Sequence, residues 1–159
     1  MTGYGYMYDA AGNRVAKGNI HAVQVNGAYN MTCDVTANGF DQISGYVVGP
    51  SGEQLTEVGA DNRWLHTNVW AGGKLIATYS MFDTGVQFHI DDPLGTRRAQ
   101  ANSAGALDAV YPSLPFGDGL AYGGTANDPT ENHFTGKERD AESGNDYMFA
   151  SEREGRSPC

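Results

Sequence analysis

The stretch TNVWAGGKLIATY, Thr67 to Tyr79, holds two apolar-rich runs on either side of the pair Gly72-Gly73. Runs rich in aromatic and β-branched residues favour β-strands. Two successive glycines tolerate the positive φ angles that both central residues of a type I′ turn require. The stretch therefore predicts an antiparallel hairpin with Gly72 and Gly73 as its two-residue turn, the clearest hairpin in the chain.

A second turn pattern recurs along the chain, in which a small polar residue is followed three places later by glycine. It spans Asp9 to Gly12, Asp92 to Gly95 and Asn102 to Gly105, with a weaker copy from Gly49 to Gly52. Asp or Asn in the first position can accept a backbone hydrogen bond, and glycine can take the left-handed fourth position. The pattern predicts several type I turns that close bulged hairpins.

Alternation dominates over helical spacing elsewhere. The segment VQFHI, residues 86–90, has an apolar residue at every second place, which puts three apolar side chains on one face of a strand and two polar ones on the other. The strongest helical pattern is a weak one over residues 105–109. The predicted fold class is all-β, built from consecutive antiparallel hairpins.

Composition bounds the function. The 159 residues suffice for about one domain, and 22 glycines with nine tyrosines suit tight turns between aromatic strands. The net charge of −9 argues against nucleic acid and anionic lipid as partners. No run is long and apolar enough for a membrane span, and the first residues show no secretory signal. Cys33 and Cys159 are not expected to form a disulfide, since Cys159 is the last residue.

Five motifs, in order, resemble the YD-repeat or RHS-repeat proteins and their RHS repeat-associated core region. Residues 6–14, YMYDAAGNR, are similar to the repeat signature, and WAGGKLIATY, residues 70–79, to the hairpin before the core. DPLGTR from residue 92 and the YPSLPFGD segment from residue 111 are similar to the core elements DxLGTxR and Y-x-PFG. FTGKERDAESGNDY, residues 134–147, is similar to the element FTGKERDxESGLDY.

The resemblance implies hairpins that join laterally into part of a curved β-shell. Family members enclose an attached toxic polypeptide or form part of cell-surface proteins, so the parent family is secreted or bound to the cell envelope. Repeats are expected over residues 1–84, the core region over 85–150 and a non-matching, disordered tail over 151–159. The family motif residues have structural roles: Tyr6, Tyr8, Asp9, Gly12, Arg14, Gly72, Gly73, Asp92, Gly95, Arg97, Phe116, Gly117, Phe134, Gly136, Lys137, Arg139, Asp140, Glu142, Gly144 and Tyr147.

The chain departs from the family after residue 150, where SEREGRSPC replaces the expected continuation and the self-cleavage motif of some members. We therefore expect a fragment or shortened copy of a longer protein. Its expected partners are the rest of an RHS polypeptide and an enclosed toxin segment. Open sheet edges are further expected to favour self-association.

Two clusters of residues could form a catalytic or a metal-binding site, but the sequence supports both sites weakly. Asp140, Glu142 and Asp146 could form a carboxylate pair, but such acids at a hairpin tip are more often solvated or bound to neighbouring cations. The cluster from His89 to Asp92 could hold a metal, but the four histidines of the chain show no paired spacing. We predict no catalytic, cofactor-binding or metal-binding residue.

Two alternatives to a non-catalytic shell fragment remain open. The first is a β module that binds glycans or a partner, and the second is a relic of a self-cleaving assembly. The aromatic residues that could form a sugar platform are more often packed against their neighbours on a sheet face. They include Trp64, Trp70, Tyr79, Phe82, Phe88 and Tyr147.

Overall fold

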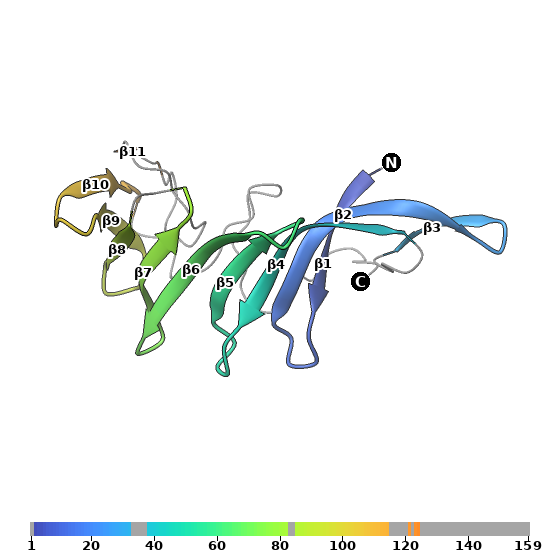
Figure 1. The fold of residues 1–159 in the computed structure, drawn as a ribbon, viewed down its shortest axis with the longest axis horizontal. Helices are drawn as coiled ribbons and strands as arrows, with labels where there is room; N and C mark the ends of the chain where they lie inside the picture. Colours follow the sequence, from blue (N-terminus) through green and yellow to red (C-terminus); the bar gives the residue numbers. More distant parts are fainter. Residues whose placement is uncertain (1, 33–37, 83–84, 115–120, 122, 125–159) are drawn as a thin grey trace. The chain divides into compact units, whose positions relative to one another are not determined.

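The computed structural model of the chain describes residues 2–32, 38–82, 85–114, 121 and 123–124. These residues form eleven strands and, within the same ranges, no helix. Each strand pairing found in them is antiparallel, and most neighbours in sequence are also neighbours in the sheet (Figure 1). The predicted all-β fold of consecutive antiparallel hairpins is confirmed. No helix long and apolar enough to cross a membrane occurs in the described part.

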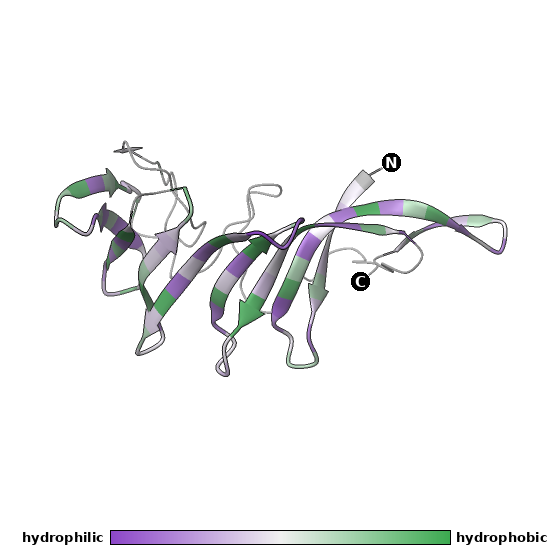
Figure 2. Ribbon diagram, in the orientation of Figure 1, coloured by the Kyte–Doolittle hydropathy of each residue, from purple (hydrophilic) through white to green (hydrophobic). Residues whose placement is uncertain are grey.

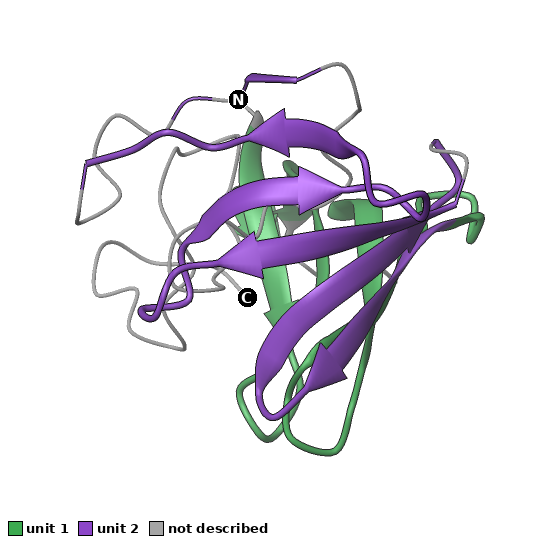
Figure 3. Ribbon diagram, turned by 90° about the vertical axis from the view of Figure 1, so that its left-hand side faces the viewer, with its two compact units in different colours: residues 1–64, 149–159 green, residues 65–148 purple. Residues whose placement is uncertain are grey.

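The described chain divides into two compact units, one up to Trp64 and one from Leu65 (Figure 3). The strands of the first unit are β1 (Thr2–Tyr8), β2 (Arg14–Val25), β3 (Ala28–Thr32), β4 (Phe40–Val48) and β5 (Gln54–Gly59). In it, β1, β2, β4 and β5 lie side by side in that order. The far half of β2 continues into a hairpin with β3, closed by Asn26 and Gly27.

The first unit has a small apolar core on one face of its sheet. Ala16 and Ile20 of β2 and Phe40 of β4 are buried together, and Met7 and Met31 pack against them. These residues share a face because Met7 lies opposite Ala16 and Ile20 opposite Phe40. The core is thus built by cross-strand neighbours on one face, as is usual for antiparallel sheets.

The second unit contains β6 (Trp64–Ala71), whose first residue belongs to the first unit, and β7 (Lys74–Ser80). It continues with β8 (Val86–Asp91), β9 (Arg97–Ala101), β10 (Leu107–Val110) and β11 (Gly123–Gly124). Gly72 and Gly73, at φ 57° and 75°, form the two-residue turn between Ala71 and Lys74. The predicted hairpin is confirmed.

The weak helical pattern at residues 105–109 was wrong. Gly105 closes a turn at φ 81°, and Leu107–Val110 is strand β10, paired with β9. The turn accounts for the change, since the backbone of Asn102 already bonds to the N–H of Gly105 and to the C=O of Ala106.

In strand β8 of the second unit, the more deeply buried face is the polar one. In β8, Gln87 is only 4% exposed, whereas Phe88 is 47% and Ile90 51% exposed. Thr78, Thr96 and Gln100 are fully buried. Figure 2 shows hydrophilic and hydrophobic bands alternating along these strands. The predicted alternation is therefore present, but the sheltered face of β8 is the polar one.

Candidate functional site

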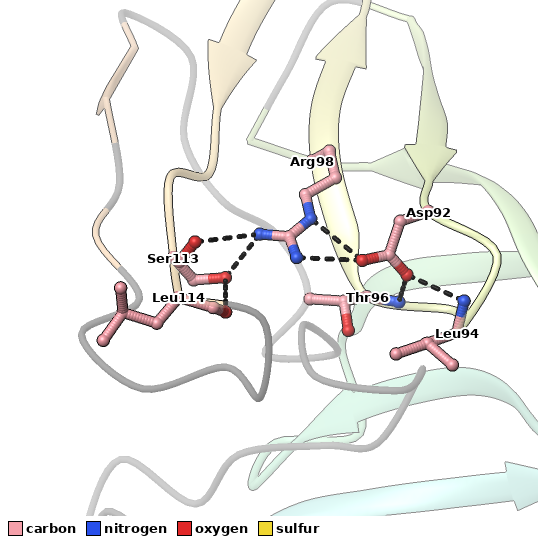
Figure 4. A network of polar contacts seen from close by, with 6 residues as sticks. All are labelled: Asp92, Leu94, Thr96, Arg98, Ser113 and Leu114. Atoms are coloured by element: carbon pink, nitrogen blue, oxygen red, sulfur yellow. Dashed lines mark hydrogen bonds and ion pairs between the residues drawn. The ribbon is translucent and has the colours of Figure 1, made fainter.

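The turn between β8 and β9 is the best-defined polar site of the described chain (Figure 4). Asp92 Oδ1 accepts hydrogen bonds from the backbone N–H groups of Leu94 (2.9 Å) and Thr96 (3.0 Å). Its other oxygen accepts from Nε of Arg98 (3.0 Å) and lies 2.9 Å from the second terminal nitrogen of that guanidinium. One carboxylate thus holds both the turn and the strand that leaves it.

Arg98 extends this network beyond the hairpin. Its remaining terminal nitrogen donates to Oγ of Ser113 (2.5 Å) and to the backbone C=O of Ser113 (3.3 Å). Ser113 Oγ in turn donates to the C=O of Leu114 (3.1 Å). The planar guanidinium has five donors in a fixed arrangement, which suits it to bind a carboxylate and a carbonyl group together. The network fastens the segment after β10 to the β8–β9 turn.

Among the residues that the structure describes, the same backbone turn occurs five times. In each, the first residue donates its N–H to the C=O of the residue four places on, at 2.8–2.9 Å, and accepts from the N–H three places on, at 2.9–3.0 Å. The fourth residue has a positive φ of 59° to 86°. This is the predicted type I turn with a left-handed fourth residue. The five turns begin at Asp9, Gly49, Gly59, Asp92 and Asn102.

Three of these turns share a side-chain cap. Asp9, Asp92 and Asn102 each accept from the backbone N–H groups two and four places on, at 2.8–3.0 Å. The cap satisfies two donors that the turn would otherwise leave to solvent, which explains the Asp or Asn in the first position. The pKa of Asp9 is lowered, chiefly by the side chain of Asn13 and then by the backbone of the turn.

The copy from Gly59 to Asn62 was missed, because Asn62 replaces the expected glycine at φ 59°. The signal was available, since asparagine tolerates the left-handed region better than other non-glycine residues.

Arg14 and Arg97 occupy equivalent places, each two residues beyond the glycine of a turn. Both side chains are buried, at 1% and 2% exposed. The guanidinium of Arg14 lies 4.4 Å from the ring centroid of Tyr6, and that of Arg97 lies 5.7 Å from the ring centroid of Tyr111. Burial makes such cation–π contacts stronger than at exposed sites.

Asp91 lies opposite Arg97 across the β8–β9 pair. Half-burial of its carboxyl group raises the pKa of Asp91, against the opposing effect of the positive charges of Arg97 and Lys74. The pKa of Asp92 is lowered: burial acts to raise it, but the bonds from Thr96, Arg98 and Leu94 together outweigh burial.

A second polar cluster lies on the sheltered face. The hydroxyl group of Thr78 lies 3.0 Å from Oδ1 of Asn68 and 2.8 Å from Nε2 of His89. Because Asn68 Oδ1 can only accept, Thr78 donates to it and accepts from His89, which places the proton on Nε2. Nearby in the sheet, Tyr111 donates to Oε1 of Gln100 at 3.3 Å. The cluster joins three strands by side-chain bonds.

In the second cluster the hydroxyl group of Thr78 lies 2.8 Å from the imidazole of His89, but the hydroxyl donates its proton to Asn68 and accepts from His89. His89 bonds to Thr78, while Asp92 bonds to Arg98. No group of three or more His, Cys, Asp or Glu side chains that could hold a metal ion occurs within the described ranges.

The structure separates the predicted motif residues into four sets. Tyr6, Tyr8, Asp9, Gly12 and Arg14 surround the first turn, and Asp92, Gly95 and Arg97 surround the fourth. Gly72 and Gly73 form the turn between β6 and β7. The other motif residues lie outside the described residues: Phe116, Gly117, Phe134, Gly136, Lys137, Arg139, Asp140, Glu142, Gly144 and Tyr147, together with Asp146, Cys33 and Cys159.

Arg98 and Ser113 were not predicted. The doublet Arg97-Arg98 was a usable signal, since neighbours in a strand point to opposite faces and two arginines then serve two different partners. Nothing local to Ser113 indicated its role. Three of the aromatic residues differ from expectation, because Tyr79, Phe82 and Phe88 are 49%, 58% and 47% exposed, whereas Trp64 and Trp70 are half-buried.

Comparison with known proteins gives little beyond this geometry. No protein-family model matches the chain, and no curated protein matches it. One solved structure with similarity is described as "Crystal Structure of TcdB2-TccC3 without hypervariable C-terminal region", with 13% identity and a TM-score of 0.32. The match covers 92% of this chain and 11% of that chain.

Proposed function

We propose that the chain is a non-catalytic wall segment of an RHS-type β-shell that encloses an attached polypeptide. The observation that carries this proposal is that one turn geometry recurs five times in the described part of the chain, with three of the turns capped by the same side-chain bonds. Repeated hairpins gain stability by pairing with their neighbours rather than by building separate cores. Such an array suits a wall that can be extended strand by strand.

The polarity of the second unit supports the same function. In an ordinary globular domain the sheltered face is apolar. Here the sheltered side chains include Thr78, Gln87 and Gln100, while Phe88 and Ile90 face outward. Buried polar side chains that bond across strands, as Thr78 does with Asn68 and His89, suit a wall because they join neighbouring strands to one another.

Protection of an attached chain tests the proposal. An unstructured reporter polypeptide is fused after Cys159 and digested with a protease, and the same reporter is digested as a separate molecule beside the unfused chain. We expect the fused reporter to be cleaved severalfold more slowly. Equal rates would remove the enclosing function. A constant intact mass of the unfused chain over days is expected for a wall, whereas a self-cleaving relic would lose mass.

A glycan- or partner-binding module is the second candidate, favoured by the half-exposed rings of Tyr79 and Phe88. Rings of this kind can stack on sugars or fill apolar pockets of a partner. Titration of the tryptophan fluorescence with a panel of sugars separates this candidate from the wall. A saturable change with one sugar would favour the binding module.

A further inference from the structure

The turn between β2 and β3 is an asparagine followed by a glycine. Val25 and Ala28 are paired residues of the two strands, so Asn26 and Gly27 form the whole loop (Figure 1). Both loop residues are exposed, and their φ angles of 52° and 84° are those of a type I′ turn. No atom of the described residues lies within 4 Å of the place where a Cβ on Gly27 would stand. The backbone nitrogen of Gly27 therefore has no side chain in front of it.

A single rotation of this turn brings the backbone nitrogen of Gly27 to the side chain of Asn26. Turning the peptide plane between the two residues converts a type I′ turn into a type II′ turn, and both turns suit antiparallel strands. The strands need not move. After the rotation, ψ of the first loop residue is about −120°. At that angle the nitrogen of Gly27 faces Cγ of Asn26 and can close a five-membered ring.

Ring closure leads to loss of the side-chain amide group. The nitrogen of Gly27 gives up its proton and forms a bond to Cγ of Asn26, while the bond from Cγ to the side-chain nitrogen breaks. That nitrogen takes up the proton and leaves as ammonia. Water then opens the resulting succinimide at one of its two carbonyl groups, which gives aspartate or isoaspartate. The sum is the hydrolysis of an amide, in which nothing is oxidised or reduced.

The other Asn-Gly pair of the sequence, Asn38-Gly39, lies in a more restrained place. Gly39 is buried, and its C=O accepts a hydrogen bond of 2.8 Å from the backbone N–H of His21. This bond holds the residue whose nitrogen would have to rotate. The fold therefore distinguishes two pairs that have the same local sequence.

Asn102 precedes the small residue Ser103, but its side chain is bound at both ends. Its Oδ1 accepts hydrogen bonds from the backbone N–H groups of Ala104 and Ala106, and its Nδ2 donates to Asp108, each at 3.0 Å. These bonds keep Cγ in the turn cap and away from the nitrogen of Ser103. Asn102 is thus an internal reference for a protected asparagine.

We propose that Asn26 is a modification site, at which the folded chain deamidates spontaneously through a succinimide formed with the nitrogen of Gly27. Either product makes the net charge of −9 more negative by one. Isoaspartate also adds a carbon atom to the backbone of the two-residue loop, which then no longer matches the Val25–Ala28 pair. The site is independent of the wall function.

The test is incubation of the 159-residue chain, folded and in urea, followed by peptide mass mapping. In the folded chain we expect Asn26 to deamidate severalfold faster than Asn38, while Asn102 stays intact. Isoaspartate should be present among the products, since direct hydrolysis of the amide cannot form it. The rate should rise at alkaline pH, because the attacking nitrogen must lose its proton. In urea, where only the local sequence acts, Asn26 and Asn38 should react at similar rates.

Two variants assign the product to its site. Asn26→Gly removes the amide group and gives the Gly-Gly loop that the chain already uses between β6 and β7, so the early release of ammonia should disappear. Asn38→Gly is the matched control, since Asn38 also has a positive φ, of 56°, and this variant should leave the early release unchanged. The proposal would be overturned by equal rates at Asn26 and Asn38 in the folded chain, by an intact Asn26 at alkaline pH, or by aspartate as the sole product.

Discussion

Asp91 and Asp92 are consecutive residues whose carboxyl groups have pKa values displaced in opposite directions. Half-burial raises the pKa of Asp91, whereas hydrogen bonds from Thr96, Arg98 and Leu94 lower that of Asp92 in spite of burial. The strand ends between them, so Asp91 faces the sheet and Asp92 faces the turn. Of these two neighbouring residues, the fold therefore disfavours the charged form of Asp91 and favours the charged form of Asp92.

This contrast predicts opposite pH dependences for two neighbouring substitutions. The native state binds a proton at Asp91 more readily than the unfolded state does, so the free energy of unfolding falls as pH rises from about 3.8 through the raised pKa. Asp91→Asn should therefore stabilise the protein at neutral pH, and the gain should vanish at acid pH below the unfolded pKa.

Asp92→Asn should act the other way. The stability that its carboxylate contributes is present above the unfolded pKa and is lost as pH falls through the lowered native pKa. The variant should be less stable than the original chain at neutral pH and no different at strongly acid pH. Urea unfolding at several pH values measures both effects, and shifts of equal sign for the two variants would contradict the assignment.

Replacement of Asn62 by glycine should stabilise the protein. It holds the left-handed position of its turn at φ 59°, where the other four copies have glycine. Glycine takes this conformation without the steric cost that other residues bear. We expect Asn62→Gly to raise the free energy of unfolding by up to about 1 kcal/mol and Asn62→Ala to lower it by a similar amount. Asn19→Gly, inside β2, is the control and should destabilise.

Gly18 should not tolerate a side chain. A Cβ there would lie 2.7 Å from Cζ of Phe40 and would also contact the backbone oxygen of Asp41, because β2 and β4 approach closely at this point. Gly18→Ala should cost about 1–3 kcal/mol or more, since the backbone cannot move aside cheaply. At Gly3 the nearest atom is at 3.4 Å, so Gly3→Ala should be close to neutral when both are measured by chemical unfolding at low protein concentration. Equal losses of stability for Gly18→Ala and Gly3→Ala would argue against the close approach of β2 and β4 at Gly18.

Thr78 should contribute more to the stability of the protein than the larger and more hydrophobic Phe88. Thr78→Val removes the hydroxyl group that bonds to both Asn68 and His89 on the sheltered face. Loss of a buried partner costs about 1–3 kcal/mol. Phe88 is 47% exposed, so Phe88→Thr should cost less and should reduce aggregation. Thermal unfolding measures the stability of both variants, and light scattering measures their aggregation. A larger loss of stability for Phe88→Thr than for Thr78→Val would contradict the assignment of the polar face as the buried one.

Much of the backbone path could be predicted because its signals are local. In the turns at Asp9, Asp92 and Asn102, every hydrogen bond that defines the turn joins residues at most four places apart. The glycine pair at Gly72 and Gly73 likewise fixes its own turn. Such contacts form within a short segment, so the residue types there suffice to predict them.

The sequence alone determined an all-β chain of antiparallel hairpins and the positions of most of its turns. Only the tertiary structure decided which face of each strand is sheltered, that Arg14 and Arg97 are buried over tyrosine rings, and that Arg98 reaches Ser113. Alternation divides a strand into two faces but carries no information on what lies above either face. The burial of a strand face and the long-range hydrogen bonds depend on segments that are far apart in the chain. These segments meet only when the strands have paired.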